Sequence, residues 1–93
     1  MNEVIWTKRA RDNLLAIRLY VGQFNPAAAR ILADKLIEKS NALANFPYRG
    51  RTVPKTNLRE LLTVPPYIVR YRIERETIVI LRIRHAARRT TKR

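Results

Sequence analysis

Hydrophobic residues recur along this chain with two different periods, which separate a helical region from a strand region. The short apolar run at residues 3–6 predicts an opening strand. Over residues 7–46, apolar side chains recur at three- and four-residue steps, as in helices with one buried face. Thr7 and Asn25 fit helix N-caps, and Pro26 fits a first helical turn. Because GQFNP separates two such helices, residues 7–46 predict a helical hairpin.

After this hairpin the period changes to two. Residues 47–57 contain two prolines and a glycine and predict a loop. Alternating apolar residues then predict three strands, at 58–64, 67–74 and 77–85, which make the three-stranded sheet of residues 58–85, followed by a basic tail at 86–93. The order β-α-α-β-β-β over residues 1–93 predicts a single α+β domain, with the helical hairpin packed on one face of a mainly antiparallel sheet. The first and last strands can pair at the sheet centre.

The same alternation predicts how the last two strands pair. A turn over residues 74–76 places Tyr71, Val79, Leu81 and Ile83 on the helix-covered face. A slip by one residue would bury Arg82 beside Val69, which is costly for a charge without a partner. We therefore predict an uncovered basic face on which exposed isoleucines lie between arginines, namely Arg70, Arg72, Arg82 and Arg84 with Ile68, Ile78 and Ile80.

The charge indicates the kind of partner. The chain has 20 basic and 7 acidic residues, a formal charge of +13, and residues 49–93 hold thirteen of the basic and three of the acidic groups. Such a surface attracts polyanions such as nucleic acid, an acidic protein segment or anionic lipid. The apolar runs are too short to span a bilayer, so we expect a cytoplasmic protein and no membrane association.

Candidate chemistry centres on His85, the single histidine of the chain. There is no cysteine and no second histidine to complete a metal site, so we expect no metal and no cofactor. As a general acid or base, His85 would need a neighbouring group, for which Glu60 and Tyr67 are candidates. Arginines on an open antiparallel sheet are ordinarily solvated, but arginines interleaved with exposed isoleucines favour a binding surface.

Almost the whole chain resembles a known superfamily. The resemblance covers about residues 3–88 and rests on five stretches in this order: VIWTKRARDNLLAIRLYV, NPAAA, LANFPYRGR, LRELLTVPPYIVRYRI and IVILRIRHAAR. Together they are similar to the RelE/ParE superfamily of bacterial type II toxins. The resemblance implies a small toxin neutralised by an acidic antitoxin that is encoded beside it. The antitoxin would wrap along the toxin.

The resemblance leaves two targets open. RelE-type members cut mRNA on the ribosome, whereas ParE-type members poison DNA gyrase. His85 and Arg88 match a His-x-x-Arg ending common among ParE-like sequences, and no aromatic residue follows His85, unlike the histidine-using ribonucleases. We therefore predict a ParE-like gyrase inhibitor whose target or antitoxin binds Arg70, Arg72, Arg82, Arg84, Arg88, Ile78 and Ile80.

The alternatives remain an mRNA interferase, with the ribosome and mRNA as partners, and a plain nucleic-acid-binding module. In the interferase the candidate catalytic residues are His85, Arg59 and Arg82. In the gyrase inhibitor we predict instead that toxicity depends on one basic surface formed by Arg59, Arg82, Arg84 and Arg88.

Overall fold

The computed structural model describes residues 2–87. Its elements follow the predicted order with one addition, a short strand in the segment expected to be a loop. The elements are β1 (Glu3–Trp6), α1 (Lys8–Gly22), α2 (Pro26–Asn41), the 3-10 helix η1 (Ala42–Ala44), β2 (Arg51–Thr52), β3 (Leu58–Leu62), β4 (Tyr67–Glu74) and β5 (Thr77–His85). Most of the predicted basic tail lies outside the described residues.

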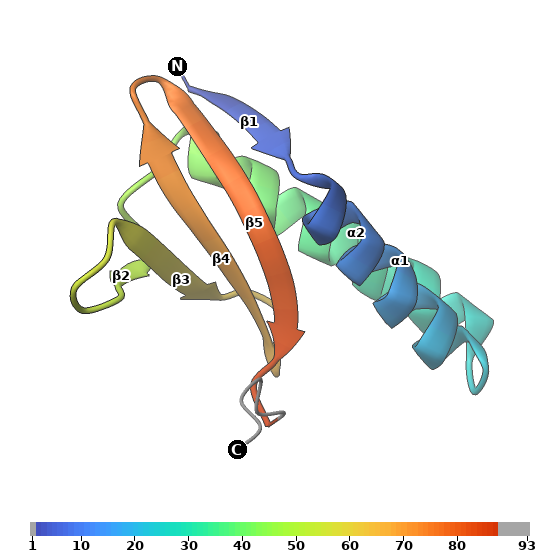
Figure 1. Ribbon diagram of the computed structural model, residues 1–93. Coiled ribbons are helices and arrows are strands. Elements are labelled where there is room, and N and C mark those ends of the chain that lie inside the picture. The colour runs from blue at the N-terminus through green and yellow to red at the C-terminus, as the bar shows by residue number, and fades with distance from the viewer. Residues whose placement is uncertain (1, 88–93) are drawn as a thin grey trace.

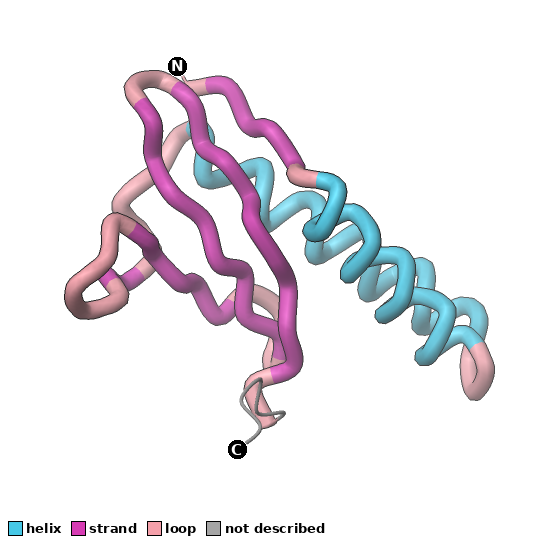
Figure 2. The backbone as a smooth tube through the Cα atoms, in the orientation of Figure 1, coloured by secondary structure: helices cyan, strands magenta, loops and turns pink. Residues whose placement is uncertain are grey.

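The five strands form one sheet in the order β1-β5-β4-β3-β2. β1 pairs with β5 in parallel, and the other neighbours pair antiparallel. The first and last strands therefore pair, as predicted, but β1 lies at the edge of the sheet and not at its centre. Figures 1 and 2 show α2 and η1 passing behind β4 and β5, which leaves the front of the sheet uncovered.

Local capping explains where the two helices begin. Thr7 Oγ1 accepts a hydrogen bond from the Ala10 amide at 3.1 Å, and Asn25 Oδ1 accepts one from the Ala28 amide at 3.0 Å. Both side chains satisfy amides that have no partner inside the helix. Neither helix of the described chain has the length and hydrophobicity needed to cross a bilayer.

The core lies between the helical hairpin and the sheet. It is a cluster of buried residues from α1, η1, β4 and β5, namely Ala10, Leu43, Val69, Tyr71, Ile78, Ile80 and Ile83. The helical period overestimates this core at its ends, because the Phe24 and Phe46 side chains are 74% and 53% exposed. Phe24 follows the end of α1 at Gly22, and Phe46 follows the end of η1 at Ala44.

The predicted pairing of β4 with β5 is wrong. The turn contains two residues, so Glu74 pairs with Thr77 and Ile73 pairs with Ile78. Arg75 adopts a φ of 57°, and tight hairpin turns require a positive φ at this position. Farther from the turn the register shifts at a β-bulge, so Leu81 is an extra residue on β5.

Because of this pairing, several β5 side chains lie on the face of the sheet opposite to the one predicted. Ile78 and Ile80 were expected on the open face, but both are fully buried in the core. Val79 was expected beneath the helices, but it lies opposite Arg72 on the other face. Leu81, also expected there, is only partly buried. The bulge changes the side to which β5 side chains point, so Ile83 faces the core as predicted.

Candidate functional site

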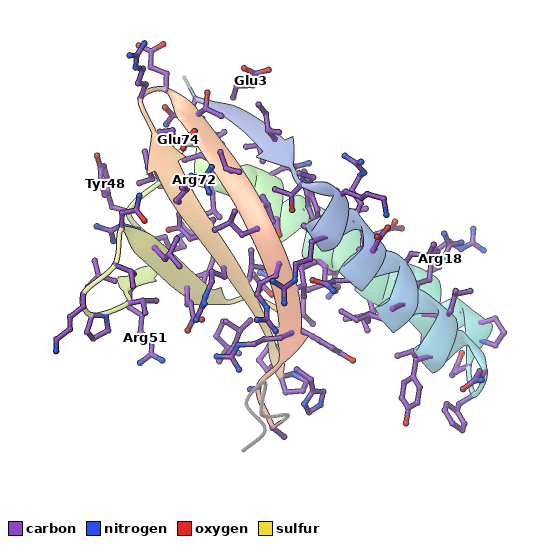
Figure 3. All side chains as sticks on the ribbon, viewed as in Figure 1. Glu3, Arg18, Tyr48, Arg51, Arg72 and Glu74 are labelled. Carbon is purple, nitrogen blue, oxygen red and sulfur yellow. The ribbon has the colours of Figure 1, made fainter. Side chains whose placement is uncertain are left out.

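The four arginines predicted to share one face do share it. Arg70 pairs with Arg82, and Arg84 lies opposite Ile68. Arg72 lies two residues from Arg70 on the same strand, and therefore projects from the same side. This side is opposite the buried core cluster, and Figure 3 shows Arg72 over the uncovered front of the sheet. We call it the open arginine face.

Glu60 is the counter-ion at the centre of this face. β3 places it beside Arg70, and its side chain is only 6% exposed. Oε2 of Glu60 accepts hydrogen bonds from Nε and Nη2 of Arg70 at 2.9 and 2.6 Å, and Nη2 of Arg84 lies 3.5 Å from Oε1. Burial raises the pKa of Glu60, but hydrogen bonding and charge from Arg70, and then from Arg84, lower it below its usual value. Glu60 is therefore ionised at neutral pH and holds both arginines.

Among the residues that the structure describes, Arg82 has no such counter-ion. Its Nε is buried and donates no hydrogen bond within residues 2–87, and no ion pair joins Arg82 to a carboxylate there. Burial lowers the pKa of the Arg82 guanidinium, and the charges of Arg9, Arg70 and Arg84 lower it further, whereas Glu60 raises it. Because an arginine stays protonated in proteins, the site contains a partly desolvated cation that forms no ion pair among residues 2–87.

Replacing Glu60 by Gln tests its role as counter-ion. We expect the free energy of unfolding at pH 7 to fall by about 1–3 kcal/mol, because charged hydrogen bonds of a buried group are lost. The pKa of the Glu60 carboxyl is lower in the folded protein than its ordinary value of 4.5. The contribution of ionised Glu60 to the free energy of unfolding is therefore complete above pH 4.5, and it is lost as the pH falls through the pKa of Glu60 in the folded protein.

Denaturant unfolding at several pH values measures this difference. The difference in free energy of unfolding between wild type and Glu60→Gln should decrease as the pH is lowered below about 4.5. The control is Glu74→Gln, because Glu74 is 54% exposed and pairs with Arg72 at the surface. This exposed pair should contribute less than about 1 kcal/mol. A gap for Glu60→Gln that is independent of pH would contradict the counter-ion role.

Arg59 lies on the other face of the sheet. It pairs with Tyr71, whose side chain is fully buried in the core. Nη1 of Arg59 donates to the Gly50 carbonyl at 2.7 Å, and the guanidinium carbon lies 5.0 Å from the centre of the Tyr48 ring. The expectation that Arg59 and Arg82 belong to one basic surface is therefore wrong. Arg88, expected in the same surface, lies outside the described residues.

His85 lies at the end of β5, on the same side as the core. It pairs with Tyr67, and the two rings contact each other edge to face at a centroid distance of 5.4 Å. Nδ1 of His85 accepts a hydrogen bond from the Ala87 amide at 3.1 Å. Of its two candidate partners the structure brings Tyr67 to the histidine, whereas Glu60 lies on the opposite face. Within residues 2–87, no group of three His, Cys, Asp or Glu side chains could hold a metal ion.

The three candidate catalytic residues do not come together. Arg82 projects from the open arginine face, whereas His85 and Arg59 project from the core side. The β4 partners of His85 and Arg59 are Tyr67 and Tyr71, four positions apart, which is about 13 Å along a strand. Their side chains also have different partners, because the Arg59 guanidinium binds the Gly50 carbonyl and lies over the Tyr48 ring, whereas the His85 ring contacts Tyr67.

Two site residues were not assigned to this face from the sequence. Arg9 lies in the first turn of α1, and its charge lowers the pKa of the Arg82 guanidinium. Glu60 was considered only as a partner of His85. Glu60 directly follows Arg59 in β3, and neighbouring residues of a strand point to opposite sides of the sheet. This alternation could have indicated that the Glu60 side chain faces the arginines.

Comparison with known proteins assigns the class. Over residues 4–90 the chain matches the family described as ParE toxin of type II toxin-antitoxin system, parDE. It is 50% identical over 88 residues to Toxin RelE2 of Caulobacter vibrioides, which covers 95% of this chain and 99% of that protein. The fold is similar to a chain of the chromosomal ParDE TA system from P. aeruginosa, with a TM-score of 0.82, 25% identity, and coverage of 91% and 96% of the two chains.

The fold and these matches define the toxin component of a type II toxin-antitoxin system, whose partner is an antitoxin. The chain belongs to the ParE toxin family of the RelE/ParE superfamily. The predicted superfamily and the α+β fold of a helical hairpin on a sheet are thereby confirmed.

Proposed function

We propose that this toxin inhibits DNA gyrase in the cytoplasm and that a cognate acidic antitoxin neutralises it. The observation that carries this proposal is the separation of the candidate catalytic residues. His85 and Arg59 lie far apart on the core side, and Arg82 lies on the opposite face. A ribonuclease must activate one hydroxyl and protonate one leaving oxygen, so two suitable groups must converge. The match to the ParE family also supports a gyrase target.

The second candidate function is a ribosome-dependent mRNA interferase. The contact between the His85 and Tyr67 rings favours it, because two groups capable of proton transfer then lie side by side. In that case cleavage would depend on His85, whereas inhibition of gyrase would not.

Parallel assays with purified toxin separate the two functions. We expect wild type and His85→Ala to inhibit supercoiling of relaxed plasmid by gyrase equally, and to leave mRNA on programmed ribosomes intact. Addition of the antitoxin should restore supercoiling. If wild type instead cleaves mRNA on the ribosome, and His85→Ala slows this cleavage by about 10²–10⁴-fold, the interferase replaces the gyrase inhibitor.

A further inference from the structure

Two exposed aromatic side chains lie close together directly after η1. The Phe46 and Tyr48 side chains are 53% and 70% exposed. Among residues 45–59, all of which the structure describes, they are the only large hydrophobic residues that are exposed. One residue separates them along the chain, so their Cα atoms lie within about 8 Å of each other. One short ligand segment can therefore contact both rings.

Each of these rings is paired with an arginine. The guanidinium carbon of Arg49 lies over the Phe46 ring, 4.5 Å from its centre, and that of Arg59 lies over the Tyr48 ring, 5.0 Å from its centre. Both rings nevertheless remain more than half exposed. Ring surface is therefore left for a second planar group, and a cation lies beside each ring.

The charge around these rings has one sign. Residues 45–59 contain no Asp or Glu, and their charged residues are Arg49, Arg51, Lys55 and Arg59. The next carboxylate along the chain, that of Glu60, belongs to the open arginine face, whereas Arg59 projects from the other side of the sheet. Figure 3 shows Tyr48 at the edge of the sheet where β2 and β3 lie. This edge therefore attracts a polyanion.

The backbone beside the rings is held in place. The Tyr71 hydroxyl donates a hydrogen bond to the Pro47 carbonyl at 2.7 Å and accepts one from the Gly50 amide at 2.9 Å. The Arg59 guanidinium donates to the Gly50 carbonyl at 2.7 Å. The two aromatic residues flank Pro47, so the same contacts position both of them. A site whose backbone is already ordered loses less conformational entropy when a ligand binds.

We propose that Phe46, Tyr48, Arg49 and Arg59 bind an unpaired strand of nucleic acid. Its bases stack on the two rings, and its phosphates pair with the two guanidinium groups. Proteins that bind single strands combine aromatic rings for the bases with cations for the phosphates. A duplex fits this site less well, because its bases are already stacked on one another. The inference goes beyond the proposed function, because the strand is a ligand additional to gyrase and no cleavage is involved.

Fluorescence anisotropy of the purified toxin with a short labelled oligothymidylate tests the proposal. We expect Tyr48→Ala and Phe46→Ala each to weaken binding by about five- to a hundredfold, because stacking on one base is lost. Tyr48→Trp should bind at least as tightly as wild type, because an indole ring also stacks. These changes leave the net charge at +13, so the effect cannot arise from overall charge. Circular dichroism confirms that each variant is folded.

Phe24→Ala is the matched control for the aromatic variants. Phe24 is 74% exposed and follows the end of α1, away from β2 and β3, so its loss should leave the affinity unchanged. Oligouridylate and a duplex of the same length are measured in parallel. Tight binding of either single strand supports the proposal, and their ratio shows whether DNA or RNA is preferred.

Salt dependence tests the role of the cations. Arg49→Gln should reduce the slope of log affinity against log salt concentration by about 0.7, the contribution of one phosphate contact on a single strand. Arg18→Gln removes a charge from α1, far from the loop (Figure 3), and should leave the slope unchanged.

Equal affinity of wild type, Tyr48→Ala and Phe46→Ala for oligothymidylate would show that net charge alone attracts the strand, which would overturn the proposal. Tighter binding of the duplex, or of a polyglutamate peptide of equal charge, with the same loss in Tyr48→Ala would also overturn it, because the rings would then serve another ligand. None of these assays contains gyrase or ribosomes, so failure here is distinguishable from failure of the proposed function.

Discussion

Replacing Ile80 by Ala is expected to lower the free energy of unfolding by about 2–5 kcal/mol, because it leaves a cavity in the core. Ile80 is fully buried and pairs with Tyr71, the largest fully buried side chain of the described core. Denaturant unfolding followed by circular dichroism measures the change. The midpoint should fall while the denaturant dependence stays that of the wild type, which identifies a change in stability alone.

Two other alanine variants make this test specific. Leu81→Ala should cost less than Ile80→Ala, because Leu81 is the extra residue of the bulge and only partly buried. Ile31→Ala, on an α2 side chain that is 57% exposed, should stay within about 0.5 kcal/mol of wild type. A larger loss for Leu81→Ala than for Ile80→Ala would contradict the bulged register and favour a hairpin that pairs without an extra residue.

Replacing Gly50 by Ala is expected to lower the free energy of unfolding by about 1–3 kcal/mol through overpacking. A Cβ at this position would lie 2.7 Å from Tyr71 Oη, 2.8 Å from Tyr71 Cε1 and 2.9 Å from the Glu60 carbonyl oxygen. The backbone approaches Tyr71 so closely because the tyrosine hydroxyl accepts a hydrogen bond from the Gly50 amide and donates one to the Pro47 carbonyl. These contacts hold residues 47–50 against the sheet.

Gly22→Ala is the control for this variant. Its added Cβ would meet Ala29 Cβ at 3.7 Å, an ordinary van der Waals distance. Since Gly22 is the last residue of α1, alanine should be neutral or should stabilise the protein by up to about 1 kcal/mol. Thermal unfolding of both variants measures the contrast. Equal stability of Gly50→Ala and wild type would show that the loop moves away from Tyr71 at little cost.

The helices and their boundaries could be predicted because the interactions that determine them are local. Thr7 and Asn25 cap amides only three residues away, and the apolar period selects the buried side of each helix. The strand β2 could not be predicted in this way. Its two residues, Arg51 and Thr52, carry no alternating pattern and become a strand only because β3 pairs with them.

That Arg70 shares a side with Arg72, and Arg82 with Arg84, followed from the sequence, because alternate residues of a strand point to one side. That the two pairs share one face depends on the bulge in β5, because the predicted pairing of the two strands was wrong. The arrangement of charge on that face did not follow. Glu60 has partners 10 and 24 residues away along the chain, Arg70 and Arg84, and Arg9 approaches Arg82 from a helix. Such pairs form only when separate elements are packed together, so their identity depends on the tertiary structure.

Apart from β2, the sequence by itself determined the strands and the helical hairpin, their order, the superfamily and the sign of the surface charge. The tertiary structure decided which side of β5 each residue faces. A regular strand would place Ile78 and Ile80 on the same side as Arg82, so an alternating pattern cannot bury the isoleucines while the arginine stays on the open face. The bulge at Leu81 inserts one residue and reverses the alternation, which buries Ile78, Ile80 and Ile83 together. The position of the bulge depends on contacts between the strands and with the helices, so it cannot be inferred from a short stretch of sequence.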